Sequence, residues 1–487
     1  MTSLHVAEYW AEYTGFALTD KQIGTVESIL DSVEDGATSV LEGPAGTGKS
    51  TLMSALILEC VMQGLTVCLT APTHKAAKVL HRMLQRLEEA TSLQMPEPKT
   101  IHSVLNLKIT RGQPGQPDKL YQSHFPELGG YDLLIVDECS MIGQELFSYI
   151  TNAVKGGGPA LLFTGDSCQL QPVNEHRKSP TFTSGTQHVL TEVLRHDGPI
   201  LTLATRARKI REPQVLQHIT ESSSVITYSS TRELEAAWLD RVVATDAAGQ
   251  EPPVMLCWTN ANRRRFNQIA RRRLHGDDVP DFMAGDQLVT LNAYMANGIT
   301  IINNNADITV KSAEFVSDYK PLPNKDYTYN AWELLLADLL PVYVISDDDA
   351  AQYRKDLAAL GAEIKKELKA AEAKVSELAD RGADFRNKEL AAARTRRNQI
   401  HSRWREEFFK LKEAFIDVDF NYSCTIHKSQ GSTFDEVFIW DDYVKSGERK
   451  ELLYVAVTRA AKAVHHMHVG PVTASQPKTA KKALVTA

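Results

Sequence analysis

A glycine-rich stretch, Val40 to Thr51, constrains the fold of this chain more than any other segment. It contains Gly-Pro-Ala-Gly-Thr-Gly-Lys-Ser, which matches the phosphate-loop pattern Gly-x-x-x-x-Gly-Lys-Ser/Thr. Residues 37–41 before it predict a short strand, and residues 52–62 after it predict a helix. This strand–loop–helix context is the one that the motif requires, so we expect an α/β fold that binds a nucleoside triphosphate.

The residues of this loop have distinct expected roles. Glycines let successive backbone N–H groups point inward, and the helix N-terminus adds the positive end of its dipole. Lys49 is expected to reach the β- and γ-phosphates, and the Ser50 hydroxyl is expected to hold Mg²⁺. The predicted nucleotide-binding set of the loop is Gly43, Gly46, Thr47, Gly48, Lys49, Ser50 and Thr51.

Two further stretches place polar side chains after predicted buried strands. Leu133 to Val136 is an apolar run followed by Asp137 and Glu138. We expect Asp137 to coordinate Mg²⁺ and Glu138 to orient or deprotonate the attacking water. Gln169, which follows the apolar run 160–163, is a candidate to sense the γ-phosphate.

A glutamine upstream of the phosphate loop has two open interpretations. Thr19 is a plausible N-cap for a helix over residues 21–32, and Gln22 lies in its first turn. A glutamine amide can pair with the donor and acceptor edge of adenine, so Gln22 could select ATP. Alternatively, Gln22 is an ordinary surface residue.

Composition limits the class of protein. The chain has 487 residues, enough for two to four domains, and a net charge of −7, so any nucleic-acid groove must be locally basic. Six cysteines include no Cys-x-x-Cys pair, which argues against a zinc site or disulfide framework. We find no signal peptide and no apolar run of about 18 residues. We therefore expect a cytoplasmic protein without membrane contact.

Three segments differ from the α/β pattern. Residues 106–122 alternate in polarity around a Gly/Pro-rich centre and predict an inserted β-hairpin. Short alternating segments from residue 284 predict a small β-barrel, and apolar residues at three- and four-residue steps over 347–415 predict two antiparallel helices.

Arginine triplets at 263–265 and 271–273 could track phosphates or form a solvated helix face.

Taken together, the motifs resemble those of superfamily 1 DNA helicases of the 5′→3′ branch, of the phage Dda type with its RecD-like relatives. The matching segments are Leu18-Thr19-x-x-Gln22, Gly43 to Thr51, Ala71-Pro72-Thr73-His74-Lys75, Thr100-Ile101-His102-Ser103, Val136-Asp137-Glu138-Cys139-Ser140-Met141, Gly165-Asp166-x-x-Gln169-Leu170-x-Pro172-Val173, Leu190-Thr191-x-x-Leu194-Arg195, Thr425-x-His427-Lys428-Ser429-Gln430-Gly431 and Tyr454-Val455-Ala456-Val457-Thr458-Arg459-Ala460. They occur in the family's order and span most of the chain.

The resemblance implies an architecture. Two RecA-like parallel-sheet domains sandwich ATP, with the first at 1–189 and the second at 190–283 and 418–470. The first carries the hairpin as a strand-splitting pin. Between the parts of the second lies an SH3-like barrel at 284–417, with a helical arm at 347–415. Residues 471–487 are expected to be a disordered tail.

The resemblance also implies site residues. Arg195 and Arg459 would act as arginine fingers, with Gln430 and Gly431 nearby. Single-stranded DNA would be contacted by family-matched positions on both domains, namely Pro72, Thr73, Lys75, His102, Thr259, Asn260 and His427. Thr73 has an alternative role as an N-cap. Tyr121 on the pin would stack on a base, or else pack the hairpin on the barrel.

The expected activity is ATP-dependent 5′→3′ translocation with unwinding of forked DNA, by a monomer that uses ATP and Mg²⁺. Two alternatives stay open. One is a DNA- or protein-docking module whose ATP site is only a switch, and the other is an RNA-directed translocase. The arm could brace the pin, bind a replication or recombination protein, or be a decoration. If the chain is of phage origin, its place would be the host cytoplasm.

Overall fold

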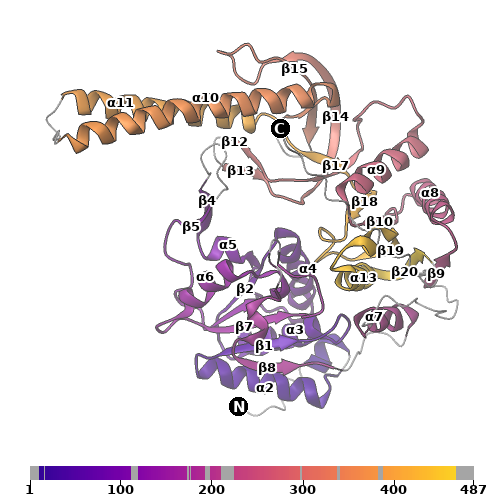
Figure 1. The fold of residues 1–487 in the computed structure, drawn as a ribbon. Helices are drawn as coiled ribbons and strands as arrows, with labels where there is room; N and C mark the ends of the chain where they lie inside the picture. Colours follow the sequence, from indigo (N-terminus) through magenta and orange to yellow (C-terminus); the bar gives the residue numbers. More distant parts are fainter. Residues whose placement is uncertain are drawn as a thin grey trace, which may run out of the picture.

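The computed structural model describes residues 10–15, 17–110, 119–172, 175, 177–191, 198–209, 224–296, 299–336, 341–381 and 388–467. It contains two parallel sheets, an antiparallel insert and a long helical arm (Figure 1). The centre of the hairpin at 111–118, Val173, Arg195 and the tail at 471–487 all lie outside the described residues.

The first domain is built on a six-stranded parallel sheet with the order β3-β2-β6-β7-β1-β8. Its strands are β1 (Thr38–Glu42), β2 (Val67–Ala71), β3 (Lys99–Thr100), β6 (Leu133–Val136), β7 (Ala160–Gly165) and β8 (Thr186–Val189). The four residues of β6 are all buried, as an apolar run between two helical layers requires. The carboxyl ends of these strands form one rim.

Helices connect and cover the strands of this sheet. They are α2 (Asp20–Glu34), α3 (Lys49–Met62), α4 (His74–Thr91), α5 (Ile101–Val104) and α6 (Gln144–Val154). Thr19 caps α2 in a capping box, because its side chain accepts from the Gln22 N–H while the Gln22 side chain accepts from the Thr19 N–H. The predicted N-cap is therefore confirmed.

The second domain is built on a five-stranded parallel sheet with the order β18-β10-β19-β20-β9. Its strands are β9 (Val225–Tyr228), β10 (Val254–Cys257), β18 (Ser423–Thr425), β19 (Phe434–Ile439) and β20 (Ala460–Met467). Its helices are α7 (Pro199–Lys209), α8 (Thr231–Ala247), α9 (Asn260–His275) and α13 (Arg449–Thr458). The expected pair of RecA-like parallel-sheet domains is thus confirmed.

An antiparallel insert separates α9 from β18. Its five-stranded sheet has the order β16-β15-β14-β11-β17, beside a two-stranded ladder β12-β13. The strands are β11 (Gln287–Thr290), β12 (Tyr294–Ala296), β13 (Ile299–Ile302), β14 (Asp307–Tyr319), β15 (Tyr329–Leu336), β16 (Val342–Ile345) and β17 (Val418–Phe420). The antiparallel character is confirmed, and the finer description as an SH3-like barrel stays a prediction.

The expected helical arm is present and projects away from the sheets (Figure 1). It comprises α10 (Asp347–Asp380), α11 (Lys388–Arg403), a π-helical turn at Trp404–Phe409 and α12 (Lys410–Lys412). The two long helices pack through Leu360, Ile364 and Leu368 against Ile400 and Trp404. This spacing of apolar residues is what predicted the hairpin of helices.

The hairpin of the first domain is also present, formed by β4 (Leu107–Thr110) and β5 (Lys119–Gln122) in antiparallel register. Across the described helices, none is long and apolar enough to span a membrane.

Four arginines of the triplets, Arg264, Arg265, Arg272 and Arg273, are exposed as a solvated helix face requires, but the other two fit neither interpretation. Arg263 is 3% exposed and lies 3.1 Å from Asp419, at the start of β17 in the insert. Arg271 is buried against Asp286, just before β11. These two side chains therefore join α9 to the insert, and they are available neither to a phosphate backbone nor to solvent.

Candidate functional site

The phosphate loop has the curled geometry that its glycines allow. Gly48 is the N-cap of α3 with φ 82°, a left-handed conformation that side-chain-bearing residues rarely adopt. A Cβ on Gly43 would lie 2.6 Å from the Thr47 hydroxyl oxygen, so a larger residue would fit only if the Thr47 side chain moved. The Lys49 ammonium donates to the carbonyl oxygens of Gly43 (2.6 Å) and Pro44 (3.1 Å) and is thus held over the loop.

The remaining residues of the phosphate loop differ in how far their side chains are exposed to solvent. Thr47 is buried and donates to the Pro44 carbonyl (2.9 Å), so its side chain braces the loop. Gly46 has φ 84°. Ser50 is exposed at the N-terminus of α3, where its hydroxyl is accessible, and Thr51 beside it is half-buried.

The two acids lie directly after β6 on the same rim. Thr164 donates its hydroxyl hydrogen to Asp137 (3.0 Å) and thereby fixes that carboxylate. Glu138 has φ 50° and ψ 42°, a strained conformation for a residue with a side chain. Burial raises the pKa of both carboxyls, and the neighbouring Asp137 raises the pKa of Glu138 further. The positive charge of Lys49 opposes these shifts.

Asp166 and Gln169 follow β7, the strand between β1 and β6. Asp166 is almost fully buried and accepts from the Cys168 N–H (3.0 Å). The Gln169 side chain is also buried, and its Oε1 has no hydrogen-bond partner in the part of the chain that the structure describes. A buried amide oxygen without a partner is costly, which is consistent with a ligand-facing role.

Arg459 reaches this rim from the second domain. An arginine on an amphipathic helix normally faces solvent, but Arg459 at the C-cap of α13 is only 7% exposed. Its guanidinium donates to the carbonyls of Val455 (3.2 Å) and Ser432 (3.1 Å). Burial lowers its pKa, while the opposite charge of Glu138 raises it. The charges of Glu138 and Arg459 thus affect each other's pKa across the boundary between the two domains.

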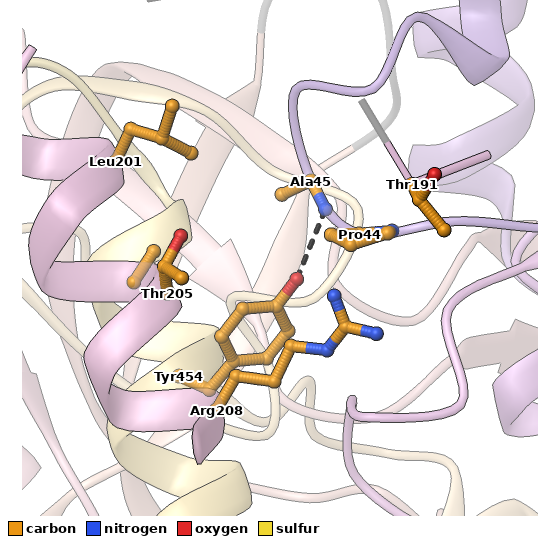
Figure 2. A pocket seen from close by; sticks show the side chains of 8 residues that line it. Pro44, Ala45, Thr191, Leu201, Thr205, Arg208 and Tyr454 are labelled. Carbon is orange, nitrogen blue, oxygen red and sulfur yellow. Dashed lines mark hydrogen bonds between the residues drawn. The ribbon is translucent and has the colours of Figure 1, made fainter. Parts of the chain in front are cut away.

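A pocket lies where the phosphate loop faces α7 and α13. It is lined by Pro44, Ala45, Thr191, Leu201, Ala204, Thr205, Arg208 and Tyr454. Figure 2 shows the Tyr454 hydroxyl directed at the backbone nitrogen of Ala45 and the Arg208 guanidinium beside it. Neither Tyr454 nor Arg208 was predicted from the sequence to have a role, although Tyr454 opens one of the matched segments.

Two residues of the loop after β18 face the first domain. Gly431 has φ 72°, and a Cβ built on it would lie 3.5 Å from the Ala76 side chain of α4. The Gln430 Nε2 atom is buried, and within the described residues it has no hydrogen-bond partner. Gly431 therefore belongs to the interface between the domains, and Gln430 directly precedes it in the chain.

Gln22, the proposed adenine-selecting residue, already uses its side-chain oxygen in a hydrogen bond within the protein. Gln22 is buried, and its Oε1 accepts from the Thr19 N–H (3.0 Å) in the capping box. The interpretation of Gln22 as a surface residue is therefore wrong. Its Nε2 has no hydrogen-bond partner among the residues described. Only this donor remains available to a base.

The candidate DNA contacts of the first domain lie at the ends of β2 and β3. Thr73 is the N-cap of α4 and accepts from the Ala76 N–H (3.2 Å), with Pro72 before it. The Lys75 ammonium lies 5.8 Å from the centre of the Phe434 ring of the second domain. Burial lowers the pKa of His102, and the neighbouring His74 lowers it further.

The candidate contacts of the second domain lie beyond β10 and β18. Asp442 accepts from the N–H groups of Trp258 (2.7 Å) and Thr259 (3.0 Å) and from the Thr259 hydroxyl (2.9 Å). This carboxylate, which the sequence analysis missed, holds the turn that presents Asn260, an exposed residue. His427 lies 3.9 Å from Glu448, and burial lowers the pKa of this histidine.

Two aromatic rings at the hairpin face solvent. Tyr121 on β5 is 42% exposed, opposite Lys108. Phe125, which the sequence analysis did not single out, is 94% exposed. Its carbonyl accepts from the Asn106 side chain (2.8 Å), so the backbone that carries this ring is tied to the base of the hairpin.

Comparison with known proteins supplies independent findings. Residues 17–230 match the model of an AAA domain, and residues 420–465 match that of a UvrD-like helicase C-terminal domain. The chain is 26% identical to the ATP-dependent DNA helicase Dda of Enterobacteria phage T4, over 91% of this chain and 97% of that protein. It is 37% identical to the ATP-dependent RecD2 DNA helicase of Deinococcus radiodurans, over 30% of this chain and 18% of that protein.

Among solved structures, the crystal structure of Bacteroides Pif1 bound to single-stranded DNA superposes with a TM-score of 0.48 at 15% identity, covering 93% of this chain and 92% of that one.

A phosphate loop, a pair of acids on the same rim and an arginine supplied by a second parallel-sheet domain define a two-domain P-loop protein of the helicase type. The motifs and the matched relatives narrow this class. By these matches the chain is similar to superfamily 1 helicases of the Pif1, RecD and Dda type.

Proposed function

We propose that this protein is an ATP-dependent DNA helicase that translocates 5′→3′ on single-stranded DNA and unwinds forked duplexes. The observation that carries the proposal is that α13 is bonded to the phosphate loop through Tyr454, and that Glu138 and Arg459, which come from different domains, are close enough for each charge to shift the pKa of the other. A site completed only when two domains meet can couple hydrolysis to their relative movement.

In this proposal each group at the interface has a chemical role. Lys49 neutralises the β- and γ-phosphates, Glu138 orients and deprotonates the attacking water, and Gln169 senses the γ-phosphate through its unpartnered amide. Arg459, and by family match Arg195, stabilise the charge that develops in the transition state. A raised pKa suits Glu138 to accept a proton near neutral pH.

The residues present also fit Mg²⁺. Ser50 offers an exposed hydroxyl and Asp137 a carboxylate fixed by Thr164, and oxygen ligands of this kind suit Mg²⁺ when nucleotide phosphates supply the rest. When bound, the ion would neutralise phosphate charge. Ser50 and Asp137 would hold it.

The proposed track for single-stranded DNA runs along the outer rims of both domains, past Thr73, Lys75 and His102 on the first, and Asn260 and His427 on the second. Thr259 contributes by holding its turn, since Asp442 engages its hydroxyl. Tyr121 on the pin would stack on a base at the fork. The names of the matched phage T4 and Deinococcus proteins, both called DNA helicases, support DNA over RNA.

The domain limits given above, activity as a monomer and partner binding through the arm complete the proposal. The docking-module alternative has no use for a water activator at Glu138 or an arginine finger at Arg459, because a switch needs only to bind ATP.

The test is an ATPase assay with and without single-stranded DNA, followed by unwinding of duplexes that carry a 5′ or a 3′ tail. We expect stimulation by single-stranded DNA and unwinding from the 5′ tail. No stimulation would refute the translocase, and unwinding only from a 3′ tail would refute the direction. Stronger stimulation by an RNA of the same sequence would favour the RNA-directed alternative.

A further inference from the structure

One tyrosine hydroxyl joins three segments of the interface between the domains. Tyr454 lies in α13 and is almost fully buried. Its hydroxyl oxygen accepts from the backbone N–H of Ala45 in the phosphate loop at 2.9 Å, the bond drawn in Figure 2. The same hydroxyl donates to the Asp166 carboxylate after β7. The two bonds run from the second domain to the first.

The chemistry of the three groups fits this arrangement. Burial raises the pKa of Tyr454, and the negative charge of Asp166 raises it further, so the hydroxyl keeps the proton that it donates. Asp166 is fixed in turn by the Cys168 N–H. A hydrogen bond to a buried carboxylate is stronger than one between neutral groups.

Arg459 does not make such a connection itself. In the described part of the chain its guanidinium donates to Val455, Ser432 and Thr458, all in the second domain. Glu138 affects Arg459 through its charge, and a charge–charge interaction, unlike a hydrogen bond, is not directional. Within α13, the directional bonds to the phosphate loop and to Asp166 are those of Tyr454, five residues before Arg459.

We propose that Tyr454 is a positioning residue, whose hydroxyl registers α13 against the phosphate loop and Asp166 so that Arg459 meets the transferring phosphate correctly. The inference rests on the proposed ATPase function and deepens it. Because Tyr454 acts through Arg459, loss of the Tyr454 hydroxyl reduces turnover far more than nucleotide affinity.

The main variant is Tyr454→Phe, which keeps the buried ring and removes both hydrogen bonds. We expect kcat of the DNA-stimulated ATPase to fall about ten-fold or more, the loss typical of a hydrogen bond to a charged group. We expect KM for ATP and the affinity for a fluorescent methylanthraniloyl-ATP to change less than about two-fold, since binding by Lys49 is intact. A kcat within two-fold of the wild-type value would overturn the inference.

Tyr443→Phe is the matched control, because Tyr443 is another buried tyrosine of the same hydrophobic core. Among the described residues its hydroxyl forms no hydrogen bond with the first domain, so we expect wild-type kcat. An equal loss in both variants would mean that removing any buried hydroxyl of this core suffices, and would overturn the positioning role.

A double-mutant cycle separates positioning from general stability. If Tyr454 acts through Arg459, Tyr454→Phe has no further effect on kcat in an Arg459→Ala background. Additive losses would overturn the inference. Should Tyr454→Phe fail to fold, Asp166→Asn weakens the same bond and decides the question, because wild-type kcat in that variant would also overturn it.

The proposed function and this inference fail in different ways. A wild-type protein without DNA-stimulated hydrolysis would refute the former, whereas a stimulated wild type with an equally active Tyr454→Phe variant would refute only the latter.

Discussion

At the scale of single residues, the site contains a backbone conformation and a carboxyl environment that are both energetically unfavourable. Glu138 combines a left-handed backbone with a carboxyl whose pKa is raised by burial. Strain of this kind costs about 1–3 kcal/mol and persists where the surroundings over-determine it. Here β6 and the turn at Cys139–Met141 fix the backbone on both sides.

The first prediction concerns this carboxyl. Glu138→Gln keeps the size of the side chain but removes the proton acceptor, so we expect hydrolysis to fall by about 10²–10⁴-fold. Binding of methylanthraniloyl-ATP should persist, because the phosphate loop is unchanged. Single-turnover hydrolysis measures the first quantity and fluorescence titration the second. Robust turnover in this variant would show that another group activates the water.

The second prediction concerns pH. Burial lowers the pKa of His102 and His427 below the ordinary histidine value, so both rings are neutral at pH 7.5. As the pH falls through these lowered pKa values the rings gain charge, and affinity for a polyanion should rise. Each protonated ring in contact with a phosphate steepens the salt dependence for single strands by about 0.7 in log–log slope.

Fluorescence anisotropy of a labelled oligothymidine over a descending pH series from 7.5, at several salt concentrations, checks this expectation. His102→Gln should show a smaller rise in affinity along the series than the wild type. An identical rise over the whole range in which the protein stays folded would contradict a phosphate contact by protonated His102. Folding is monitored in parallel, because protonation of a residue buried neutral disfavours the folded state below its unfolded pKa.

At the scale of elements, buried ion pairs fasten the insert to the second domain. Arg271 of α9 pairs with Asp286 before β11 and donates to the Pro280 carbonyl at 2.8 Å. Lys428, after β18, donates to the Leu291 carbonyl (3.1 Å) of the insert, and burial lowers its pKa. These contacts fasten the insert to α9 and to the loop after β18.

The third prediction tests the buried pair. Asp286→Ala leaves the Arg271 charge buried without its partner and should lower the free energy of unfolding by about 3–5 kcal/mol. Thermal and urea denaturation measure the loss. The control is Asp240→Ala. Asp240 of α8 is the exposed partner of Arg273, which lies on the same helix as Arg271, and its removal should lower the free energy of unfolding by at most about 1 kcal/mol. Equal effects would contradict a special role for the buried pair.

The fourth prediction concerns the hairpin. Tyr121→Ala should reduce unwinding of forked DNA by about ten-fold, since stacking on a base contributes about 1–3 kcal/mol, while DNA-stimulated ATPase is retained. Phe125→Ala, at the base of the same hairpin, shows whether the more exposed ring carries the stacking instead. Equal loss of unwinding and ATPase in the Tyr121 variant would refute a role confined to strand separation.

Local elements were predictable from sequence because each depends on neighbouring residues. The apolar run before Asp137 and the three- and four-residue spacing in α10 each reflect a contact made within one element. The burial of Arg263 and Arg271 was not predictable from sequence, because their acidic partners lie far along the chain or beyond a turn. A charge on a helix does not reveal which face the fold will bury.

At the scale of the molecule, the two sheets bring together residues that are distant in sequence. Tyr454 and Arg459 come within reach of Ala45 and Glu138 only because β19 and β20 place α13 opposite the phosphate loop. The motif match predicted that Arg459 would meet the nucleotide, but its burial and the hydroxyl bridge depend on tertiary packing. Sequence patterns alone do not encode those distances.

The last prediction addresses coupling between the domains. A non-hydrolysable ATP analogue with Mg²⁺ should slow amide hydrogen exchange both at the phosphate loop, 43–51, and in α13, because Arg459 draws α13 onto the bound phosphates. In Arg459→Ala the loop should still be protected while the nucleotide-dependent protection of α13 is lost. Arg449→Ala, at the other end of α13, serves as the control and should behave as the wild type. Protection of α13 that survives in Arg459→Ala would mean that closure is driven by other contacts, and Arg459 would then act on the chemical step alone.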